Sequence, residues 1–360
     1  MASTEPRTKF VLQLEPRLTR SRIDVSWGGG YEALLGLIMF AGHQPPGDYY
    51  AGQEWFDAVH ARASARLHQD IARLCAGVPT VFGHLLGLVR RAREPRDIAG
   101  LIEVVSRLAP RELRLELLGR SSSTVQMGLA HAVLERASDG DPAATEELLA
   151  VAADDERWSA NIRAVLALTP RQTSELTVRV LCGWAAEVFA EQEPSLTPRL
   201  AEQAGRWRAT AARKSWRDVV EIATGGIVLG EDLPADNVLL VPTVLGAPWV
   251  YSTDAQGTRI FCCPVRDQTG PTATEVVSLL RALGDETRLA ILRWLATDGP
   301  ATLPELTALL GISKSAVHKH VVLLRSAGLI RAELGSERRY ALRDLPDLNE
   351  LVAHVIGAGR

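Results

Sequence analysis

Residues 311–330, which read GISKSAVHKHVVLLRSAGLI, carry side chains suited to binding a polyanion. The apolar residues Val317, Val321 and Leu324 recur at helical spacing and predict one buried stripe on a helix. The other side of this helix carries Ser313, Lys314, Ser315, His318 and Lys319. A helix face that meets only water usually mixes both signs of charge, so a basic face without acids indicates an anionic partner.

Duplex DNA is the partner that this chemistry fits best. Its major groove, about 12 Å wide, admits one helix. Lysine donates to guanine, and serine and histidine can donate or accept, so we expect four side chains to face base edges. These are Lys314, Ser315, His318 and Lys319. Taken singly, each residue fits a solvated helix face beside a structural hairpin better than a DNA contact, and only their combination favours DNA.

The sequence on either side of this helix predicts the further helices that would hold it in position. Helices are expected at 274–284, 286–296, 303–310 and 313–327. Thr302 and Glu305 form a capping-box pattern, and Gly311 suits the turn between the last two helices. Two short helices joined by a tight glycine-containing turn are typical of a helix-turn-helix.

A two-stranded hairpin follows, with LIRAEL and RRYALR separated by GSE, which makes the predicted domain a winged helix. A further apolar helix is expected at 347–357. We expect the helix caps and the wing to hold phosphates and so fix the docking angle. The residues are Thr302, Ser313, Arg331, Ser336, Arg338 and Arg339. His320 lies near the apolar stripe and is expected to pack or to bind a phosphate.

These segments resemble the ArsR/SmtB family of bacterial winged-helix regulators. The resemblance rests on LGDETRLAILRWL with its Arg288-Leu289 pair, on ISKSAVHKHVVLLRSAGLI and on RRYALR, and it covers about residues 274–357. It implies a repressor that binds a palindromic operator as a homodimer joined through the first and last helices of this domain. The preceding part is similar to a poorly characterised helical domain found in some actinobacterial regulators.

Length and charge agree with a two-part molecule. The chain has 360 residues, 46% of them hydrophobic, and a formal net charge of −3. Residues 311–343 carry seven Lys or Arg against two acids, so the net charge of +5 in this segment leaves −8 for the remainder. A local basic site on an acidic molecule again indicates a polyanion. With four cysteines and no signal-like apolar run at the start, we expect a soluble cytoplasmic protein without a membrane segment.

We expect a mainly α fold with small β elements. Residues 1–265 would form a helical sensor or dimerisation domain with β elements near 9–27 and 226–265, the latter an antiparallel meander. Residues 266–273 would be a linker, and 274–360 the winged helix. Long helices are predicted at 53–76, 170–192 and 197–223, among others, and Thr169-Pro170 with Gln172 predicts a capped start.

A sensor function is harder to place. The predicted helix 303–310 lacks cysteine, and the last helix offers only Asp347 and His354, so metal binding at the family's usual positions is not expected. Cys262 and Cys263 are adjacent in a predicted strand and should point to opposite faces, which favours packing over redox chemistry. Seven tryptophans precede residue 271, including Trp158, Trp184, Trp207 and Trp216, and a pocket between helices for an unidentified effector is a hypothesis.

Enzymatic motifs are not found, and no cofactor or metal site is predicted: the sequence has no Walker loop, no G-x-S-x-G and no H-E-x-x-H. We therefore expect a DNA-binding regulator and not an enzyme. The main alternative is a protein-interaction scaffold that uses the winged helix for docking. A third possibility is an enzyme in the helical domain that the C-terminal reader controls.

Overall fold

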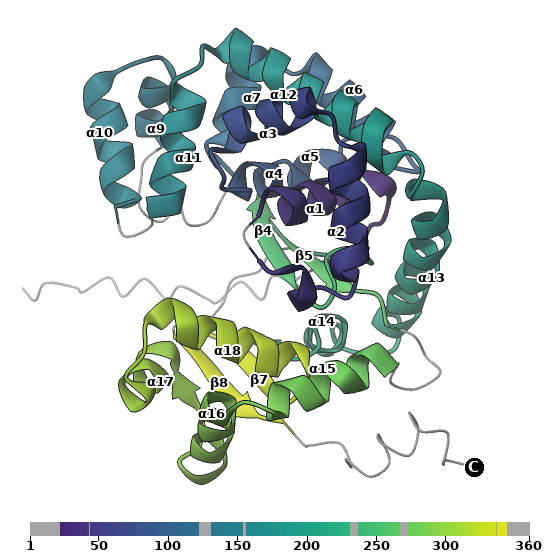
Figure 1. Cartoon of the computed structure of the whole chain (residues 1–360), viewed down its shortest axis with the longest axis vertical. Helices are drawn as coiled ribbons and strands as arrows, with labels where there is room; N and C mark the ends of the chain where they lie inside the picture. The colour runs from purple at the N-terminus through teal and green to yellow at the C-terminus, as the bar shows by residue number, and fades with distance from the viewer. Residues whose placement is uncertain are drawn as a thin grey trace, which may run out of the picture.

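The structure is a computed structural model that describes residues 22–42, 44–121, 131–153, 156–230, 237–266, 273–335 and 337–343, except for the side chains of 22, 156, 157, 273–275 and 278. Most of the β region predicted near 9–27, the last predicted helix and most of the predicted linker lie outside the described residues. A large helical part stands above a small C-terminal domain, with a mixed sheet between them (Figure 1). The mainly α fold with small sheets is confirmed.

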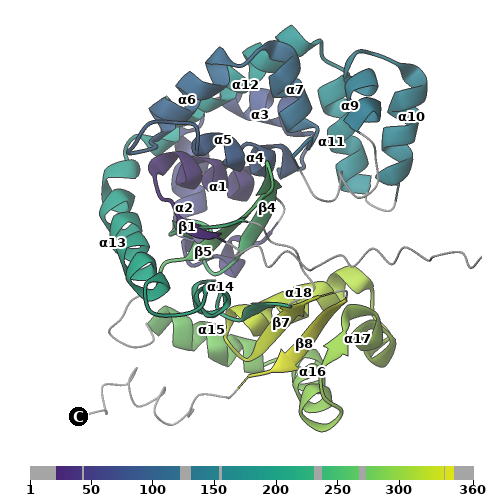
Figure 2. The same ribbon diagram turned by 180° about the vertical axis from the view of Figure 1, so that it is seen from behind.

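Helices account for most of the N-terminal part; those before α13 cover one side of the sheet, and α14 lies on the other (Figure 2). In chain order they are α1 (Gly29–Ala41), the 3-10 turn η1 (Pro46–Asp48), α2 (Gly52–Arg62), α3 (Ala65–Cys75), α4 (Thr80–His84), α5 (Leu86–Val89), α6 (Ile98–Arg107), α7 (Pro110–Leu117), α9 (His131–Ser138), α10 (Pro142–Val151), α11 (Glu156–Leu166), α12 (Pro170–Trp184), the π-helical turn η2 (Ala185–Phe189), α13 (Glu193–Ala211) and α14 (Trp216–Thr224). Among the described helices, no single one has the length and apolar composition to cross a bilayer, and only the bent pair Ala65–Cys75 with Thr80–Val89 does so when taken together.

Two of the long predicted helices are interrupted by serine caps. The prediction at 53–76 divides into α2 and α3, because the Ser64 side chain accepts from the Leu67 N–H at 3.2 Å and starts a new helix. The prediction at 197–223 divides at Ser215, which forms a capping box with Asp218. Serine competes well for exposed backbone N–H groups, so it favours a helix start over a helix interior. The predicted capping box of Thr169 and Gln172 is confirmed.

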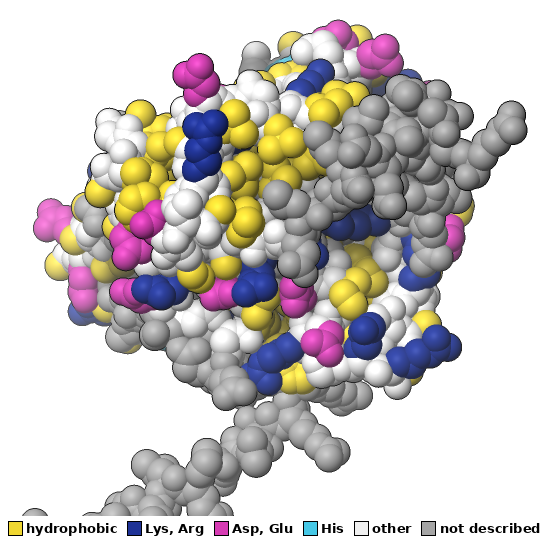
Figure 3. Space-filling model, turned by 90° about the horizontal axis from the view of Figure 1, so that it is seen from below, with side chains coloured by type: hydrophobic (Ala, Val, Ile, Leu, Met, Phe, Trp, Pro, Cys, Tyr) yellow, Lys and Arg dark blue, Asp and Glu magenta, His cyan; other side chains and the backbone are white. Residues whose placement is uncertain are grey.

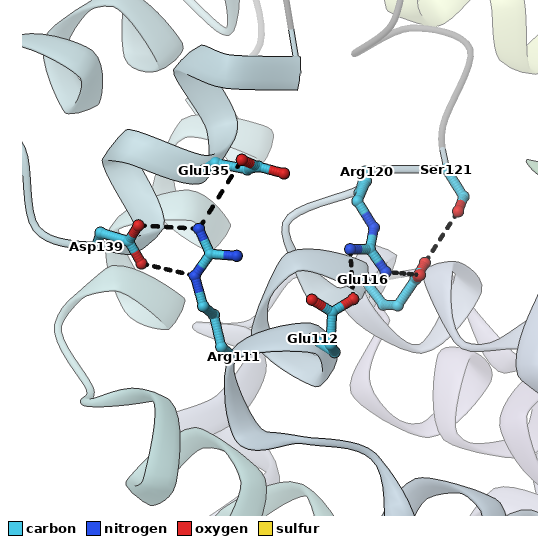
Figure 4. Close-up of polar contacts among 7 residues, drawn as sticks. All are labelled: Arg111, Glu112, Glu116, Arg120, Ser121, Glu135 and Asp139. Atoms are coloured by element: carbon cyan, nitrogen blue, oxygen red, sulfur yellow. Dashed lines mark hydrogen bonds and ion pairs between the residues drawn. The ribbon is translucent and has the colours of Figure 1, made fainter.

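Charged side chains hold α7 against its neighbours (Figure 4). Arg111 donates to both carboxylate oxygens of Asp139, at 2.8 and 2.9 Å, and so joins α7 to the residue that follows α9. Arg120 lies 2.6 Å from both Glu112 and Glu116. Glu116 is only 6% exposed, and it also accepts from Ser121 at 3.0 Å. This buried carboxylate is therefore fully partnered, as the cost of desolvating a charge requires.

The first sheet has the strand order β1-β3-β5-β4. The strands are β1 (Arg22–Val25), β3 (Asn237–Thr243), β4 (Tyr251–Ala255) and β5 (Thr258–Pro264). The pairs β1–β3 and β3–β5 are parallel, and only β4–β5 is antiparallel. The antiparallel meander predicted for this region is therefore wrong. Both faces of β3 are buried, and a strand covered on both faces reads as a continuous apolar run, which is typical of parallel sheets.

Alternate residues of these strands enter two different cores. Leu239, Val241 and Cys262 pack with α1 and the helices around it. Val238 and Cys263 face the other way, toward α13 and α14. The sheet is thus the middle layer between the N-terminal helices and the α13–α14 pair.

A buried carboxylate fixes α1 to the loop that follows β3. Glu32 is fully buried and accepts from the backbone N–H groups of Val244 and Leu245, both at 2.9 Å. Burial raises the pKa of Glu32, and these two donors favour its charged form. The loop held in this way leads directly to Trp249 and Tyr251, which face the C-terminal domain.

The C-terminal domain is a winged helix with one additional strand. Its helices are α15 (Ala273–Leu283), α16 (Glu286–Thr297), α17 (Leu303–Leu310) and α18 (Lys314–Ser326). Its sheet has the order β2-β7-β8-β6, with β2 (Ile227–Leu229), β6 (Ala301–Thr302), β7 (Ile330–Leu334) and β8 (Arg338–Leu342). Strands β7 and β8 form the predicted wing hairpin.

The first strand of this sheet, β2, precedes the predicted linker by more than thirty residues. It pairs in parallel with β7, with Ile227 opposite Ala332 and Leu229 opposite Leu334. The prediction placed β2 in the N-terminal meander, and the structure assigns it to the winged-helix sheet instead. Strand β2 is therefore a structural connection between the two parts of the chain.

Candidate nucleic-acid interface

Helices α17 and α18 form the predicted helix-turn-helix. The side chain of Thr302 accepts from the Glu305 N–H, and the Glu305 carboxylate accepts from the Thr302 N–H at 2.7 Å, so the predicted capping box starts α17. Gly311 ends the helix with φ +64°, a conformation that costs glycine little because it has no Cβ. Ser313 then caps α18 by accepting from the Ala316 N–H at 3.3 Å.

The predicted apolar stripe of α18 is the side that faces the core of the domain. Val317, Val321 and Leu324 are at most 1% exposed, and they pack in the cluster that also contains Ile291 and Leu306. This packing turns the opposite side of α18 outward. All four residues predicted to face base edges are exposed: Lys314, Ser315, His318 and Lys319.

The outer side of α18 faces the N-terminal part of the molecule across a cleft (Figure 1). The cleft has a volume of about 820 Å³, and we refer to it as the interdomain cleft. From α18 it is lined by Ser315, His318, Lys319, Val322 and Arg325, among others, which follow one another at helical spacing. Lys314 is exposed but does not line the cleft. The predicted reading face is thus directed toward another part of the same chain.

One ion pair closes the cleft at its edge. The Lys319 Nζ atom lies 3.1 Å from Oδ2 of Asp48 in η1. The Asp48 side chain is 19% exposed, and Lys319 is the one cation recorded near it among the described residues. The backbone carbonyl of Asp48 accepts from the Trp249 ring N–H at 3.0 Å, which holds η1 on the loop after β3. A predicted DNA contact is therefore engaged by an acid in this arrangement.

The wall opposite α18 is aromatic. Tyr49, Trp249, Tyr251 and Phe261 line it. The hydroxyl groups of Tyr49 and Tyr251 lie 3.3 Å apart, and the Tyr49 and Trp249 rings are 6.3 Å apart. The sequence did not single out Tyr49, Tyr251 or Phe261, because they come from distant segments that only the fold brings together; Trp249 is one of the seven tryptophans considered for a pocket. Of the tryptophans considered for a pocket, Trp184 and Trp207 are instead core residues.

The wing arginines are divided between the two faces of their sheet. Arg338 lines the interdomain cleft, whereas Arg339 follows it in the strand and points to the other face. Arg331 is on the same face as Arg339 and pairs with Glu333 at 2.9 Å. Ser336 lies outside the described residues. The arginines predicted to act together at the wing therefore lie on two faces, with Arg338 on one and Arg331 and Arg339 on the other.

The two hydroxyl groups predicted to hold phosphates already have partners. The Thr302 hydroxyl donates to Glu305 at 2.9 Å, and the Ser313 hydroxyl lies 3.1 Å from the Ser315 hydroxyl. Both residues cap helices, and a helix start offers backbone N–H groups to a phosphate whether or not the hydroxyl itself is free. Their predicted role in DNA binding stays a prediction.

Two histidines of α18 are in surroundings that disfavour protonation. Partial desolvation of the ring, which lies in the cleft, lowers the pKa of His318, and the nearby cations Arg338, Arg325 and Lys314 lower it further. Burial also lowers the pKa of His320, against the opposing effect of Asp285, whose Oδ1 is 3.7 Å from Nδ1. Both rings are therefore neutral at pH 7, and His320 packs beside Asp285 as a partly buried residue.

Arg325 is a functional candidate that the sequence reasoning missed. It is 7% exposed and donates to the Thr224 carbonyl at 3.0 Å, which anchors α18 to the end of α14. Burial lowers its pKa to about 10, so it keeps its charge at neutral pH. Its spacing in the sequence could have identified it, because residue 325 lies seven positions after His318 and three after Val322 and therefore shares their face of the helix.

The described part of the chain holds no cluster of metal ligands, and its two adjacent cysteines are buried. It contains no cluster of three or more His, Cys, Asp or Glu side chains that could hold a metal ion. Cys262 and Cys263 are fully buried and enter opposite cores, as predicted from strand alternation. Burial raises the pKa of both thiols, so the thiolate form that reacts with oxidants is disfavoured.

Residues 283–333, from the end of α15 to β7, match a protein family described as a helix-turn-helix domain. The chain contains a helix-turn-helix domain. Neither curated proteins nor solved structures include a match to the chain. The family match and the geometry of α17, Gly311 and α18 together support DNA binding and transcriptional regulation as the class of function.

Proposed function

We propose that the chain is a sequence-specific double-stranded DNA-binding regulator of the ArsR type that acts as a repressor. It would bind a palindromic operator as a homodimer, with α18 in the major groove and the wing on the flanking phosphates. The observation that carries this proposal is α18 itself. It is a Ser-capped helix with a buried apolar stripe, and its outer residues include Lys314, His318 and Lys319 but no acid.

Reading DNA requires the interdomain cleft to open. A cavity of about 820 Å³ has the size of a small-molecule site, and a duplex does not fit between α18 and the aromatic wall. We therefore assign the structure to a closed state, in which the N-terminal part lies opposite most of the reading face and leaves no room for a duplex. The C-terminal domain must move away from Asp48 before it binds DNA.

The proposed dimer is supported by α15. Val276 and Leu279 are buried in the domain, whereas Val277 and Leu280 are 43% and 44% exposed. The helical periodicity of this segment predicts that Val276, Val277 and Leu280 all point inward, and this prediction is wrong for Val277 and Leu280. In the view from below, hydrophobic side chains gather in a broad area that only a few charged side chains interrupt (Figure 3). An apolar helix face of this kind is typical of an interface between copies.

Selection of bound fragments from the host genome with the full-length protein would test the DNA proposal. We expect one or a few enriched palindromic sites whose affinity falls steeply with salt, because neutralised phosphates release counterions. Lys314→Ala should weaken binding to the selected site by about tenfold, within the roughly 1–3 kcal/mol of a base contact. Lys314 suits this test better than Lys319, because loss of Lys319 would also release the closed state.

Lys214→Ala is the matched control, since it removes one exposed lysine that lies outside the winged helix. Equal losses in both variants would contradict a specific role for α18. If no fragment were enriched and partners bound independently of salt, a protein-interaction scaffold would replace the proposal. One observation favours that alternative: α18 already contacts a protein surface through Lys319 and Asp48.

A further inference from the structure

The interdomain cleft combines two walls of different chemistry. One wall is aromatic and apolar, with Tyr49, Trp249 and Tyr251. The other wall carries Lys319, Arg325 and Arg338. No carboxylate lines the cleft among the described residues.

The positive charge in the cleft is incompletely neutralised. Lys319 has Asp48 as a partner at the edge, and Arg325 is held by a neutral carbonyl. Arg338 is exposed, and no ion pair is recorded for it among the described residues. His318 lies between these cations and is neutral, so it adds a polar group without adding charge. The cationic wall is therefore able to accept an added anionic group.

The size and position of the cleft fit a small molecule. Its volume of about 820 Å³ is within the range of roughly 300–1,000 Å³ found for ligand sites. A second cavity of about 520 Å³ shares Arg338, Tyr251 and Phe261 with it, so the space continues along β4. Aromatic side chains bind flat apolar groups by stacking, and arginine binds carboxylates and phosphates through paired N–H groups.

We propose that the interdomain cleft binds an organic anion with a flat apolar body and one carboxylate, sulfonate or phosphate group. The apolar body lies on Trp249 and Tyr251, and the anionic group meets Arg338 and Lys319. The ligand contacts both walls at once, so it binds the closed state better than an open one. A ligand shifts a conformational equilibrium by this difference in affinity.

The consequence for DNA rests on the proposed function. Because the ligand holds α18 against the N-terminal part and occupies its cations, ligand and duplex exclude each other. The ligand would act as an inducer that releases the protein from its operator. The ligand-binding step itself does not depend on whether the protein binds DNA.

Three probes with the same ring and different charge would test the binding step. Isothermal titration of the full-length protein is expected to show binding of 2-naphthoate, weaker binding of neutral 2-naphthalenemethanol and no binding of the cation 2-naphthylmethylammonium. Arg338→Gln should weaken naphthoate binding by about tenfold, the factor expected for one charge-assisted hydrogen bond.

Arg339→Gln is the matched control, because it removes an equal charge from the next residue on the opposite face of the wing. Equal affinity of naphthoate for both variants would overturn the assigned site. The proposal would also fail if the three charge types bound alike, or if neither 2-naphthoate nor naphthyl phosphate bound below about 1 mM.

A second measurement separates this proposal from the proposed function. Naphthoate should raise the apparent Kd of the protein for its selected DNA site, and Arg338→Gln should reduce this effect relative to Arg339→Gln. Naphthoate binding at Arg338 without an effect on DNA affinity would overturn the inducer role. A protein that binds naphthoate at Arg338 but binds no DNA would confirm the ligand site and overturn the proposed function.

Discussion

His84 is a partly buried histidine that lines the second cavity. Its Nδ1–H donates to the Leu117 carbonyl at 2.8 Å, which joins α4 to the end of α7. Burial lowers the pKa of His84 below the ordinary value of 6.5. Protonation in the folded state would place a charge where the protein supplies little solvation.

The stability of the protein should therefore fall in mild acid. Below pH 6.5 the unfolded chain takes up a proton at residue 84 that the folded chain resists, so the free energy of unfolding decreases as the pH falls. The lowered pKa values of His318 and His320 act in the same direction. His84→Asn keeps a donor for Leu117 without a titrating group, and it should flatten part of this dependence.

Melting temperatures measured between pH 7.5 and 5 would show this difference between the wild type and His84→Asn. His131→Asn is the control, because His131 is exposed on α9. An unchanged pH dependence in His84→Asn would mean that folding does not lower the pKa of His84, because both states would then take up the proton alike.

The role of a residue was predictable from the sequence where that role depends on its near neighbours in the chain. The capping residues Thr302 and Ser313 and the stripe of Val317 and Val321 depend on neighbours within one or two helical turns, and the structure confirms them. Asp48 was not predictable as a partner of Lys319. The two residues are 271 positions apart, and no local pattern encodes a contact of that kind.

At the level of elements, α15 has two apolar faces and only one of them is covered. Leu280→Glu places a charge on the uncovered face and should convert the proposed dimer into a monomer, because a buried charge without a partner opposes association. Light scattering after gel filtration would measure the mass.

Leu309→Glu is the comparison variant, because Leu309 is 41% exposed on α17 and is not part of α15. It should leave the mass unchanged. A wild-type monomer at tens of micromolar, or an equal effect of both variants, would remove α15 from the proposed interface.

The elements themselves were predictable to different degrees. Helices with clear caps, such as α12 and α17, were placed well from the sequence. The sheets were not, because β1 pairs with β3 across about two hundred intervening residues and β2 pairs with β7 across about one hundred. A strand carries information about its burial but little about which distant strand will be its partner.

For the whole molecule, the closed state predicts that removing an acid from the N-terminal part improves DNA binding. Asp48→Asn removes the charge that engages Lys319, so it should favour the open state and raise DNA affinity by about two- to fivefold, as expected for a partly exposed ion pair. Small-angle scattering should show a larger radius of gyration for this variant.

Glu54→Gln removes a nearby acid that is exposed on α2, and it controls for the change in overall charge. If both variants gained the same affinity, the effect would be a general reduction of repulsion from the duplex. If Asp48→Asn gained none, the Asp48–Lys319 pair would not limit opening.

The position of β2 also affects how this reader could be transplanted. An engineer who fuses the winged helix to a different sensor would naturally cut near residue 270, where composition changes. In such a fusion protein β7 would become an edge strand without its partner β2, and unpaired edge strands promote aggregation. A chimera should therefore carry residues 225–230 along with the reader, even though they are encoded on the far side of the junction.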